Sequence, residues 1–249
     1  MNYSNRGFGL NIPKITKNIL ILNIVLFLLT QIGIATNRYD LTHYLAIYHP
    51  LSENFRPFQL ITYMFMHGSF GHIFFNMFAL VMFGKILENV WGEKKFFIYY
   101  LVTGVGAALF SIGVTYLRYY ILKSQVPENV LNNILLNGRE LLENQKNFAN
   151  PVYGKLNLLV NYTANIPTVG ASGAIFGILM AFGMMFPDAQ LMLLFPPIPI
   201  KGKYIAIVAL VLGVMMDFRG NVAHFAHLGG MVFGYILIKY WRKNTTNFY

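Results

Sequence analysis

The chain has 249 residues, of which 56% are hydrophobic and 11% are charged, less than half the charged fraction of an ordinary soluble domain. Nine acidic residues argue against paired-carboxylate glycosidase chemistry and acidic metal cages, and the absence of cysteine excludes disulfides, thiolate zinc sites and cysteine nucleophiles. The net charge of +10 comes with basic residues beside apolar spans, a pattern typical of membrane proteins. We therefore expect a membrane protein and no nucleic-acid binding.

Six apolar segments predict an all-α, polytopic membrane protein built as a six-helix bundle. In chain order they are Ile19–Ala35, Gly71–Val90, Phe96–Leu122, Ala171–Phe186, Tyr204–Met216 and Val222–Tyr240. The first is longer than the apolar core of a typical signal peptide and lacks a small-residue cleavage site, so we interpret it as an uncleaved span. A short interfacial segment from Pro57 precedes the second span, because His67 and the glycines after it interrupt the apolar run.

An even number of spans places both ends of the chain on one side of the membrane. That side receives eleven basic and three acidic residues, against eight and six on the other, so we expect it to be the cytoplasm. The predicted organisation is a cytoplasmic tail over 1–18, a membrane domain over 19–242 and a cytoplasmic tail over 243–249. The absence of cysteine and of a sorting signal fits a bacterial plasma (inner) membrane.

A long polar insertion, 123–167, separates the third and fourth spans on the outer side. It contains many asparagines, and we expect a solvated outer loop. Its apolar residues leave open a short surface helix within it; they are Leu131, Ile134, Leu135, Leu141 and Leu142.

Polar side chains gather in the apolar spans, where an unpaired polar group costs about 2–7 kcal/mol and therefore needs a partner or a function. His67, His72 and Asn76 lie in or beside the second span, Ser172 in the fourth and His227 in the sixth. His72 and Asn76 are four residues apart and share one helix face. Counted along their helices, Asn76, Ser172 and His227 lie about 8 to 9 Å beneath the outer surface of a ~30 Å core. This common depth indicates one shared site.

Two glycine pairs at a spacing of four residues accompany these polar groups. They are Gly173 with Gly177, after Ser172, and Gly230 with Gly234, after His227. Small residues at this spacing let helix backbones approach closely in lipid. The second pair lies on the same side of its helix as His227. If the two pairs pack together, Ser172 and His227 meet.

A serine beside a histidine base is the minimal activated hydroxyl nucleophile, because the imidazole takes the proton as the oxygen attacks a carbonyl. Glu88, the one acid within these six segments, is counted on the cytoplasmic side, so the spans offer no acid to orient the histidine, and Ser172 and His227 would act as a dyad. The oxyanion of the intermediate then needs hydrogen-bond donors. The side chains of His72 and Asn76 and the backbone amide of Ser172 can supply them.

Other interpretations of the same residues stay open at this level. A serine among glycines and alanines is often a packing residue. His224 and His227, three residues apart, could join His67 and His72 in holding a transition metal or a haem. No HExxH motif is present, so a zinc-metalloprotease site is not supported, and we expect neither a metal nor a cofactor.

Three motifs in this order resemble those of the rhomboid family of intramembrane serine proteases, and the resemblance covers nearly the whole chain apart from the N-terminal tail and the insertion. The motifs are His67-x4-His72-x3-Asn76 in the second span, Gly170-Ala171-Ser172-Gly173-Ala174 opening the fourth, and Ala226-His227-Leu228-Gly229-Gly230 with Gly234 in the sixth.

The resemblance implies hydrolysis of peptide bonds in or near transmembrane segments of membrane proteins, with Ser172 as nucleophile and His227 as general base. It further implies that His72 and Asn76 line the oxyanion hole. His67 and the two glycine pairs are implied to be structural. Phe176 falls where many members carry a tyrosine that stacks on the histidine.

The implied partners are transmembrane protein substrates and membrane lipid, and the oligomeric state is left open. A helical substrate hides its carbonyls, so cleavage is expected to favour segments that unwind readily. The alternative is a non-catalytic rhomboid-like protein that binds membrane helices.

Overall fold

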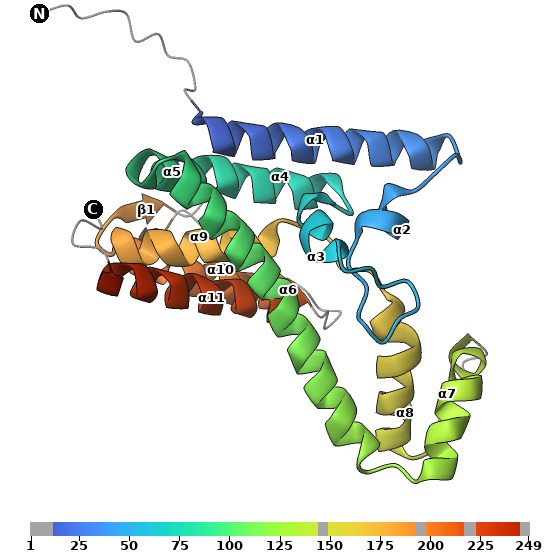
Figure 1. Cartoon of the computed structure of the whole chain (residues 1–249). Helices are drawn as coiled ribbons and strands as arrows, with labels where there is room; N and C mark the ends of the chain where they lie inside the picture. The colour runs from blue at the N-terminus through green and yellow to red at the C-terminus, as the bar shows by residue number, and fades with distance from the viewer. Residues whose placement is uncertain (1–11, 144–148, 193–197, 217–222, 245–249) are drawn as a thin grey trace, which may run out of the picture.

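The computed structural model describes residues 12–143, 149–192, 198–216 and 223–244 (Figure 1). Each predicted span corresponds to a helix, and the prediction of an all-α polytopic membrane protein is confirmed. The helical spans are α1 (Lys14–Ala35), α4 (Phe70–Ala79) continued by α5 (Lys85–Trp91), α6 (Glu93–Lys123), α9 (Ser172–Met185), α10 (Ile205–Met216) and α11 (Ala223–Asn244).

The spans differ in length. Among the described residues, Lys14–Ala35, Phe70–Trp91 and Glu93–Lys123 are long and apolar enough to cross a membrane, whereas Ser172–Met185 and Gly202–Gly213 are shorter apolar helices. A small antiparallel ribbon, β1 (Gln190–Met192) with β2 (Pro199–Lys201), connects α9 to α10. No strand was predicted between these two spans.

The ends of the membrane domain differ slightly from the prediction. α1 begins at Lys14 and not at Ile19, and α11 continues to Asn244. The parts of the predicted tails over 1–11 and 245–249, and the predicted start of the sixth span at Val222, lie outside the described residues.

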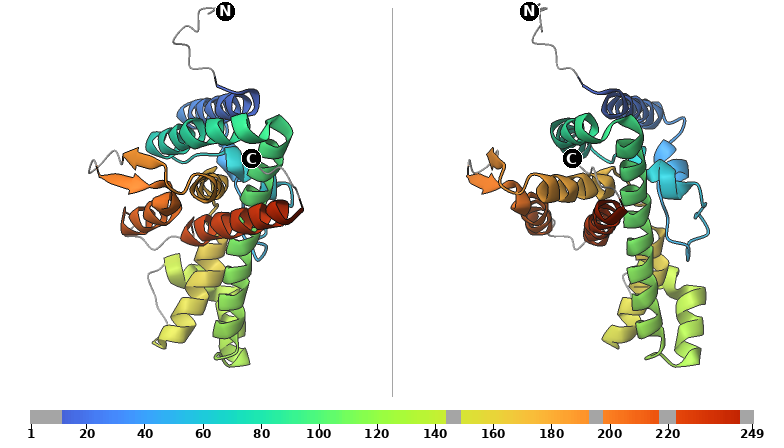
Figure 2. Two further views of the ribbon diagram at one scale, coloured as in Figure 1. Left: turned by 90° about the vertical axis from the view of Figure 1, so that its left-hand side faces the viewer. Right: turned by 60° about the vertical axis from the view of Figure 1, so that its left-hand side comes forward.

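Helix α9 is the centre of the bundle. In Figures 1 and 2, α1, α4, α9 and α11 run side by side, and α6 crosses them obliquely and extends beyond them. Eleven of the fourteen residues of α9 are buried, since α6, α10 and α11 all pack against it. A helix that is apolar all round is suited to this position.

The start of α1, the start of α6 and the end of α11 lie together at one end of the bundle (Figure 1). This end holds basic residues from several elements, among them Lys14, Lys95, Lys203 and Arg242. We call it the basic end. Because α1 begins and α11 ends there, the two described ends of the chain are on the same side of the bundle.

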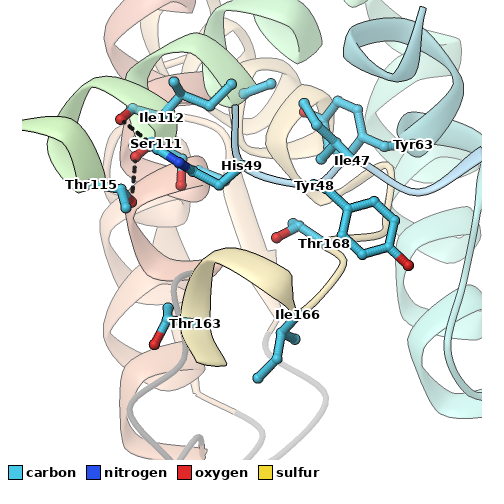
Figure 3. A pocket seen from close by; sticks show the side chains of 12 residues that line it. Ile47, Tyr48, His49, Tyr63, Ser111, Ile112, Thr115, Thr163, Ile166 and Thr168 are labelled. Atoms are coloured by element: carbon cyan, nitrogen blue, oxygen red, sulfur yellow. Dashed lines mark hydrogen bonds between the residues drawn. The ribbon is translucent and has the colours of Figure 1, made fainter. Parts of the chain in front are cut away.

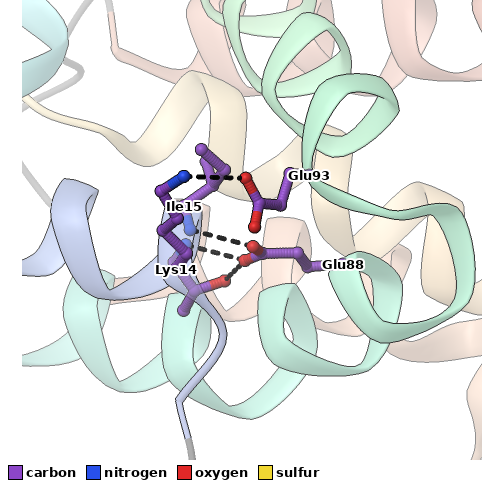
Figure 4. Close-up of polar contacts among 5 residues, drawn as sticks. Lys14, Ile15, Glu88 and Glu93 are labelled. Atoms are coloured by element: carbon purple, nitrogen blue, oxygen red, sulfur yellow. Dashed lines mark hydrogen bonds and ion pairs between the residues drawn. The ribbon is translucent and has the colours of Figure 1, made fainter.

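A buried carboxylate fixes α1 at the basic end (Figure 4). Glu88 of α5 is 3% exposed and accepts hydrogen bonds from the backbone N–H groups of Ile15 and Thr16, both at 2.8 Å, and from the Thr16 hydroxyl at 2.7 Å. The first N–H groups of a helix have no partner within the helix, so Glu88 caps α1 from another span. Beside it, Lys14 pairs with Glu93 at the surface.

Farther along, α1 packs loosely on its neighbour. An apolar groove of about 480 Å³ lies between the two helices, lined on the α1 side by residues such as Leu20 and Phe27 and on the α4 side by Ile73 and Phe74. Helix α4 passes into α5 through a π-helical turn, Leu80–Gly84, which holds one residue more than an α-helical turn.

The loop after α1 contains α2 (Leu41–Leu45) and leads into α3 (Gln59–Thr62) and a tight turn, Tyr63–Phe65. Gln59 is buried and holds this loop together. Its amide nitrogen donates to the carbonyls of Tyr44 and Asn54, and its amide oxygen accepts from the backbone N–H of Arg56.

The insertion 123–167 is largely helical, which corrects the predicted solvated loop. It forms α7 (Glu128–Glu143) and α8 (Pro151–Asn157), continued by a π-helical turn, Leu158–Tyr162, and a short turn, Thr163–Asn165, while 144–148 lie outside the described residues. The expected surface helix through Leu131 and Leu142 corresponds to α7. The two helices bury Ile134 and Leu156 completely. Asn161 donates hydrogen bonds to the Ile134 carbonyl and the Asn157 side chain, so asparagines expected in a loop join helices instead.

Candidate active site

Ser172 and His227 are in contact. Oγ of Ser172, the first residue of α9, lies 2.8 Å from Nε2 of His227 in α11, within hydrogen-bond distance. Both side chains are half-buried. A hydroxyl and an imidazole from spans 55 residues apart in sequence therefore meet at the end of the bundle opposite the basic end.

Glycines bring the two helices close enough for this contact. A Cβ atom added to Gly230 would collide with the main-chain oxygen of Gly173, and one added to Gly234 would lie 3.2 Å from Cα of Gly177. The two glycine pairs thus lie against each other as their spacing predicts. Gly173 and Gly177 also face α6, since added Cβ atoms there would lie 2.5 Å from Cβ of Ala107 and of Thr103.

The segment leading into Ser172 passes close to His72. Gly170 has φ of +126°, a conformation that side chains other than glycine's rarely adopt. A Cβ atom at Gly170 would lie 2.7 Å from Nε2 of His72 and 3.6 Å from Oγ of Ser172, so both atoms border the same small space. The backbone N–H of Gly170 donates to the carbonyl of Tyr63 at 2.9 Å, and the Tyr63 hydroxyl donates to the carbonyl of Gly104 at 2.8 Å.

Asn76 lies one helical turn after His72 on α4. It is 6% exposed, and its amide nitrogen has no hydrogen-bond partner among the residues that the structure describes. A buried donor of this kind is costly unless a ligand or water completes it. His67 is buried and packs edge-on against the His72 ring at 4.9 Å, so it supports the position of His72 from behind.

Two rings flank the His227 imidazole. Phe176, one turn after Ser172, stacks on it with centroids 4.3 Å apart and planes within 17°. His224 approaches edge-on at 6.3 Å. Within the described ranges, no group of three or more histidine or acidic side chains could hold a metal ion.

A small cavity of about 40 Å³, shown in Figure 3, is lined by Tyr63 and Thr168 and also by Ala226, the residue before His227. Polar side chains line part of it, among them His49, Ser111, Thr115 and Thr168. A volume of this size holds about two to three water molecules. His49 lies in the loop after α1, and burial lowers the pKa of this histidine from its ordinary value of 6.5.

Two residues that shape the site, Gly170 and Tyr63, and one that holds the loop after α1, Gln59, were not predicted in these roles. Gly170 appeared in a motif, but its positive φ and its closeness to His72 were not foreseen. Tyr63 carries no local signal, because its partner is the backbone carbonyl of Gly104, 41 residues away. Gln59 carries none either, because its partners are backbone groups of the loop. The antiparallel pairing of Ile47 with Thr168, which ties the loop after α1 to the segment before Ser172, was likewise not predicted.

These features define a class of protein, a polytopic helical membrane protein with a serine–histidine pair between two closely packed spans. Residues 18–248 match the model of the family described as Eukaryotic integral membrane protein (DUF1751), and the chain belongs to this family of rhomboid-like membrane proteins.

Several curated relatives carry rhomboid names. Rhomboid protein 1, mitochondrial, of Saccharomyces cerevisiae is 29% identical over 68% of this chain and 38% of its own length. Rhomboid protease AarA of Providencia stuartii is 27% identical over 70% of this chain and 52% of its own length. Presenilin-associated rhomboid-like protein, mitochondrial, of Bos taurus is 28% identical over 74% of this chain and 42% of its own length. The chain thus spans between about two fifths and half of their length.

The comparisons support an integral membrane protein but not the predicted bacterial plasma membrane. The matching family is described as eukaryotic, and two of these three relatives are mitochondrial. The absence of cysteine and of a sorting signal, on which the prediction depended, does not distinguish these membranes.

Proposed function

We propose that the chain is an intramembrane serine endopeptidase that hydrolyses peptide bonds in or near transmembrane segments of membrane proteins. The observation that carries this proposal is the 2.8 Å contact between Oγ of Ser172 and Nε2 of His227. Phe176 stacked on the imidazole and the glycine contacts between α9 and α11 support it, because they hold both groups in place.

In the first step, Nε2 of His227 takes the hydroxyl proton while Oγ of Ser172 attacks the carbonyl carbon of the substrate. The tetrahedral intermediate collapses, the C–N bond breaks, and His227 gives the proton to the departing amine. An ester on Ser172 remains. Water then attacks this ester with His227 again as base, which releases the carboxylate product and restores the hydroxyl.

Three donors are available to the oxyanion. The Ser172 backbone N–H points out of the start of α9, where the helix dipole favours negative charge. His72 borders the space beside Oγ of Ser172. Asn76 lies one turn further along the same face, and its amide nitrogen has no hydrogen-bond partner among the described residues. Each such donor typically contributes about 10²- to 10³-fold to the rate.

The proposed substrates are membrane-spanning helices presented from surrounding lipid. Their carbonyls become accessible only where the helix unwinds, so glycine, proline or small polar residues near the cleavage site favour the reaction. The cavity next to Ala226 is large enough to hold water for the second step.

The test is cleavage of a panel of single-span substrates by purified protein in liposomes. We expect Ser172→Ala and His227→Ala each to abolish cleavage, whereas His224→Ala, which removes a neighbouring histidine from the same helix, keeps most of it. A fluorophosphonate probe should label the wild type and not Ser172→Ala. Substrate binding without labelling or cleavage would point to the non-catalytic helix-binding alternative.

We also propose that the tail over 1–18 and the tail over 243–249 share one compartment, the cytoplasmic side of the host membrane, with the insertion 123–167 on the other side. Support comes from the common position of the two described chain ends and from the basic residues gathered there. The cysteine-free sequence permits a direct test. Cysteines placed singly at Lys243 and at Glu128 should react with an impermeant maleimide from opposite sides.

A further inference from the structure

A hollow of about 390 Å³ opens at the basic end, between the start of α6 and the end of α11. It is lined by Trp91, Lys94, Lys95, Ile98 and Trp241. It lies at the end of the bundle opposite Ser172 and takes no part in the proposed catalysis.

The walls of the hollow are aromatic and its rim is cationic. The Lys95 ammonium lies 4.9 Å from the ring centroid of Trp241 and 5.7 Å from that of Trp91, and the two indoles meet edge-on at 5.8 Å. Tyr99 packs against both indoles from within the bundle. The packed rings hold Lys95 at the mouth of the hollow, since a cation is attracted to an indole face.

Two acidic residues that flank the lining in sequence, Glu88 and Glu93, already have partners. Glu93 pairs with Lys14 at 3.3 Å, and Glu88 is turned inward to cap α1. The ammonium group of Lys94 is exposed and makes no ion pair or hydrogen bond with any residue in the described part of the chain. The hollow therefore presents positive charge that complements an anion.

An apolar track continues from the hollow along α6. Ile98, Val102 and Leu109 are 37–48% exposed, and their spacing puts them on one helix face, below the lysines. From Ile98 to Leu109 the track runs about 16 Å along the helix. A cationic rim above an apolar track of this length has the polarity and dimensions of a phospholipid, with its phosphate between the lysines and one acyl chain along α6.

We propose that this hollow binds the headgroup of an anionic phospholipid. The lysines supply charge, the indoles supply the flat walls typical of the membrane–water interface, and the exposed face of α6 supports the acyl chain. The lipid site shares no residue with the Ser172–His227 pair, so lipid binding can be tested separately from the proposed peptidase activity.

The chain provides its own reporter for this site, because its two tryptophans, Trp91 and Trp241, both line the hollow. All tryptophan fluorescence therefore comes from the hollow. The protein is reconstituted in phosphatidylcholine bilayers that carry a small, equal fraction of brominated phosphatidylglycerol or brominated phosphatidylcholine. We expect the brominated anionic lipid to quench with an apparent association constant about tenfold higher, as two nearby lysines allow.

The double variant Lys94→Gln/Lys95→Gln should lose this preference. The matched control is Lys201→Gln/Lys203→Gln, which removes the same charge from exposed lysines at the same end and should keep it. Circular dichroism and thermal unfolding in unbrominated lipid verify that both variants fold.

Equal quenching by the two brominated lipids would overturn the proposal. So would an equal loss in both double variants, since that would mean diffuse attraction to the basic end rather than a site. Soluble glycerol phosphate should not displace the lipid at millimolar concentration. If it does, the hollow is a phosphate site that does not need the acyl chain, and the lipid assignment is wrong.

Discussion

The contact between α9 and α11 and the contact between α1 and α4 are built in opposite ways. Where α9 meets α11, glycines let the two backbones touch, and the Ser172–His227 pair lies at the end of that contact. Where α1 meets α4, large side chains keep the helices apart and leave an apolar groove of about 480 Å³, while α1 is fixed at its start by Glu88.

The difference shows which contacts set atomic distances and which only hold the bundle together. In lipid, helices gain little from burying apolar side chains, because acyl chains are equally apolar. Backbone contact between small residues leaves no side chain that can rearrange, so it fixes the separation of groups on the two helices. A side-chain contact with a groove tolerates movement, and a polar cap at one end is enough to keep α1 in place.

Gly230→Ala should have the largest effect, because its new Cβ would collide with the main-chain oxygen of Gly173. We expect a loss of about 2–3 kcal/mol of stability and a fall in cleavage rate of more than tenfold, since the collision separates α9 from α11. Thermal unfolding and substrate cleavage measure both. Gly113→Ala is the control, since nothing lies within 4 Å of its added Cβ. A Gly230→Ala protein with wild-type melting and cleavage would show that backbone contact is not required.

Glu88→Gln should come next, and it tests the other contact. The substitution removes the charge that accepts the hydrogen bonds of Ile15 and Thr16, which should cost about 2 kcal/mol. Labelling of Ser172 in the folded fraction should persist, because the dyad lies at the opposite end. Glu93→Gln, which breaks only the exposed pair with Lys14, should change stability by less than about 1 kcal/mol. Equal effects of the two substitutions would contradict the capping role.

Phe176→Leu should slow cleavage about two- to tenfold, since an aromatic stacking contact contributes about 0.5–1.5 kcal/mol. Phe182→Leu is the matched control on the same helix, because Phe182 packs on Phe83 and Phe186 and not on the dyad. It should lower the unfolding temperature without lowering the rate per folded molecule. If both variants slow cleavage equally, the stacking of Phe176 on His227 does not contribute specifically to the rate.

His49→Gln should have the smallest effect, which is a change in how stability depends on pH. Burial lowers the pKa of His49 in the folded protein, so the fold favours the neutral ring. That stability is fully present above pH 6.5 and is lost as the pH falls below this value toward the lowered pKa. Between pH 7 and pH 5, the unfolding temperature of the variant should therefore fall less than that of the wild type. If the unfolding temperatures of the variant and the wild type fall equally with pH, burial of neutral His49 does not contribute to the pH dependence of stability.

Much of this architecture follows from local patterns. Apolar runs predicted the helical spans, and glycines spaced four apart after Ser172 and after His227 predicted that these two residues meet. Both signals are readable because each depends on residues of one helix. The resemblance to rhomboids then pointed to the family that the comparisons identify.

The features that could not be predicted are hydrogen bonds to groups of other segments, for which the sequence gives no local signal. In the sequence Glu88 counted only as a charge, because the groups that donate hydrogen bonds to it are backbone N–H groups of α1. Gln59 acts through backbone carbonyls in the same way. The insertion looked like a loop because asparagine favours turns, yet Asn161 finds partners on α7 and α8 that only the folded hairpin brings together.

The π-helical turn Leu80–Gly84 divides the second span into two halves with different tasks, one carrying His72 and Asn76 and the other carrying Glu88. One extra residue rotates everything that follows by about 100° relative to an uninterrupted α-helix. The angular phase between the proposed oxyanion donors and the cap of α1 is therefore set by the extra residue of the π-helical turn and not by the choice of side chains. Deleting a single residue here would keep every side chain of interest and still turn one half of the span away from its partner.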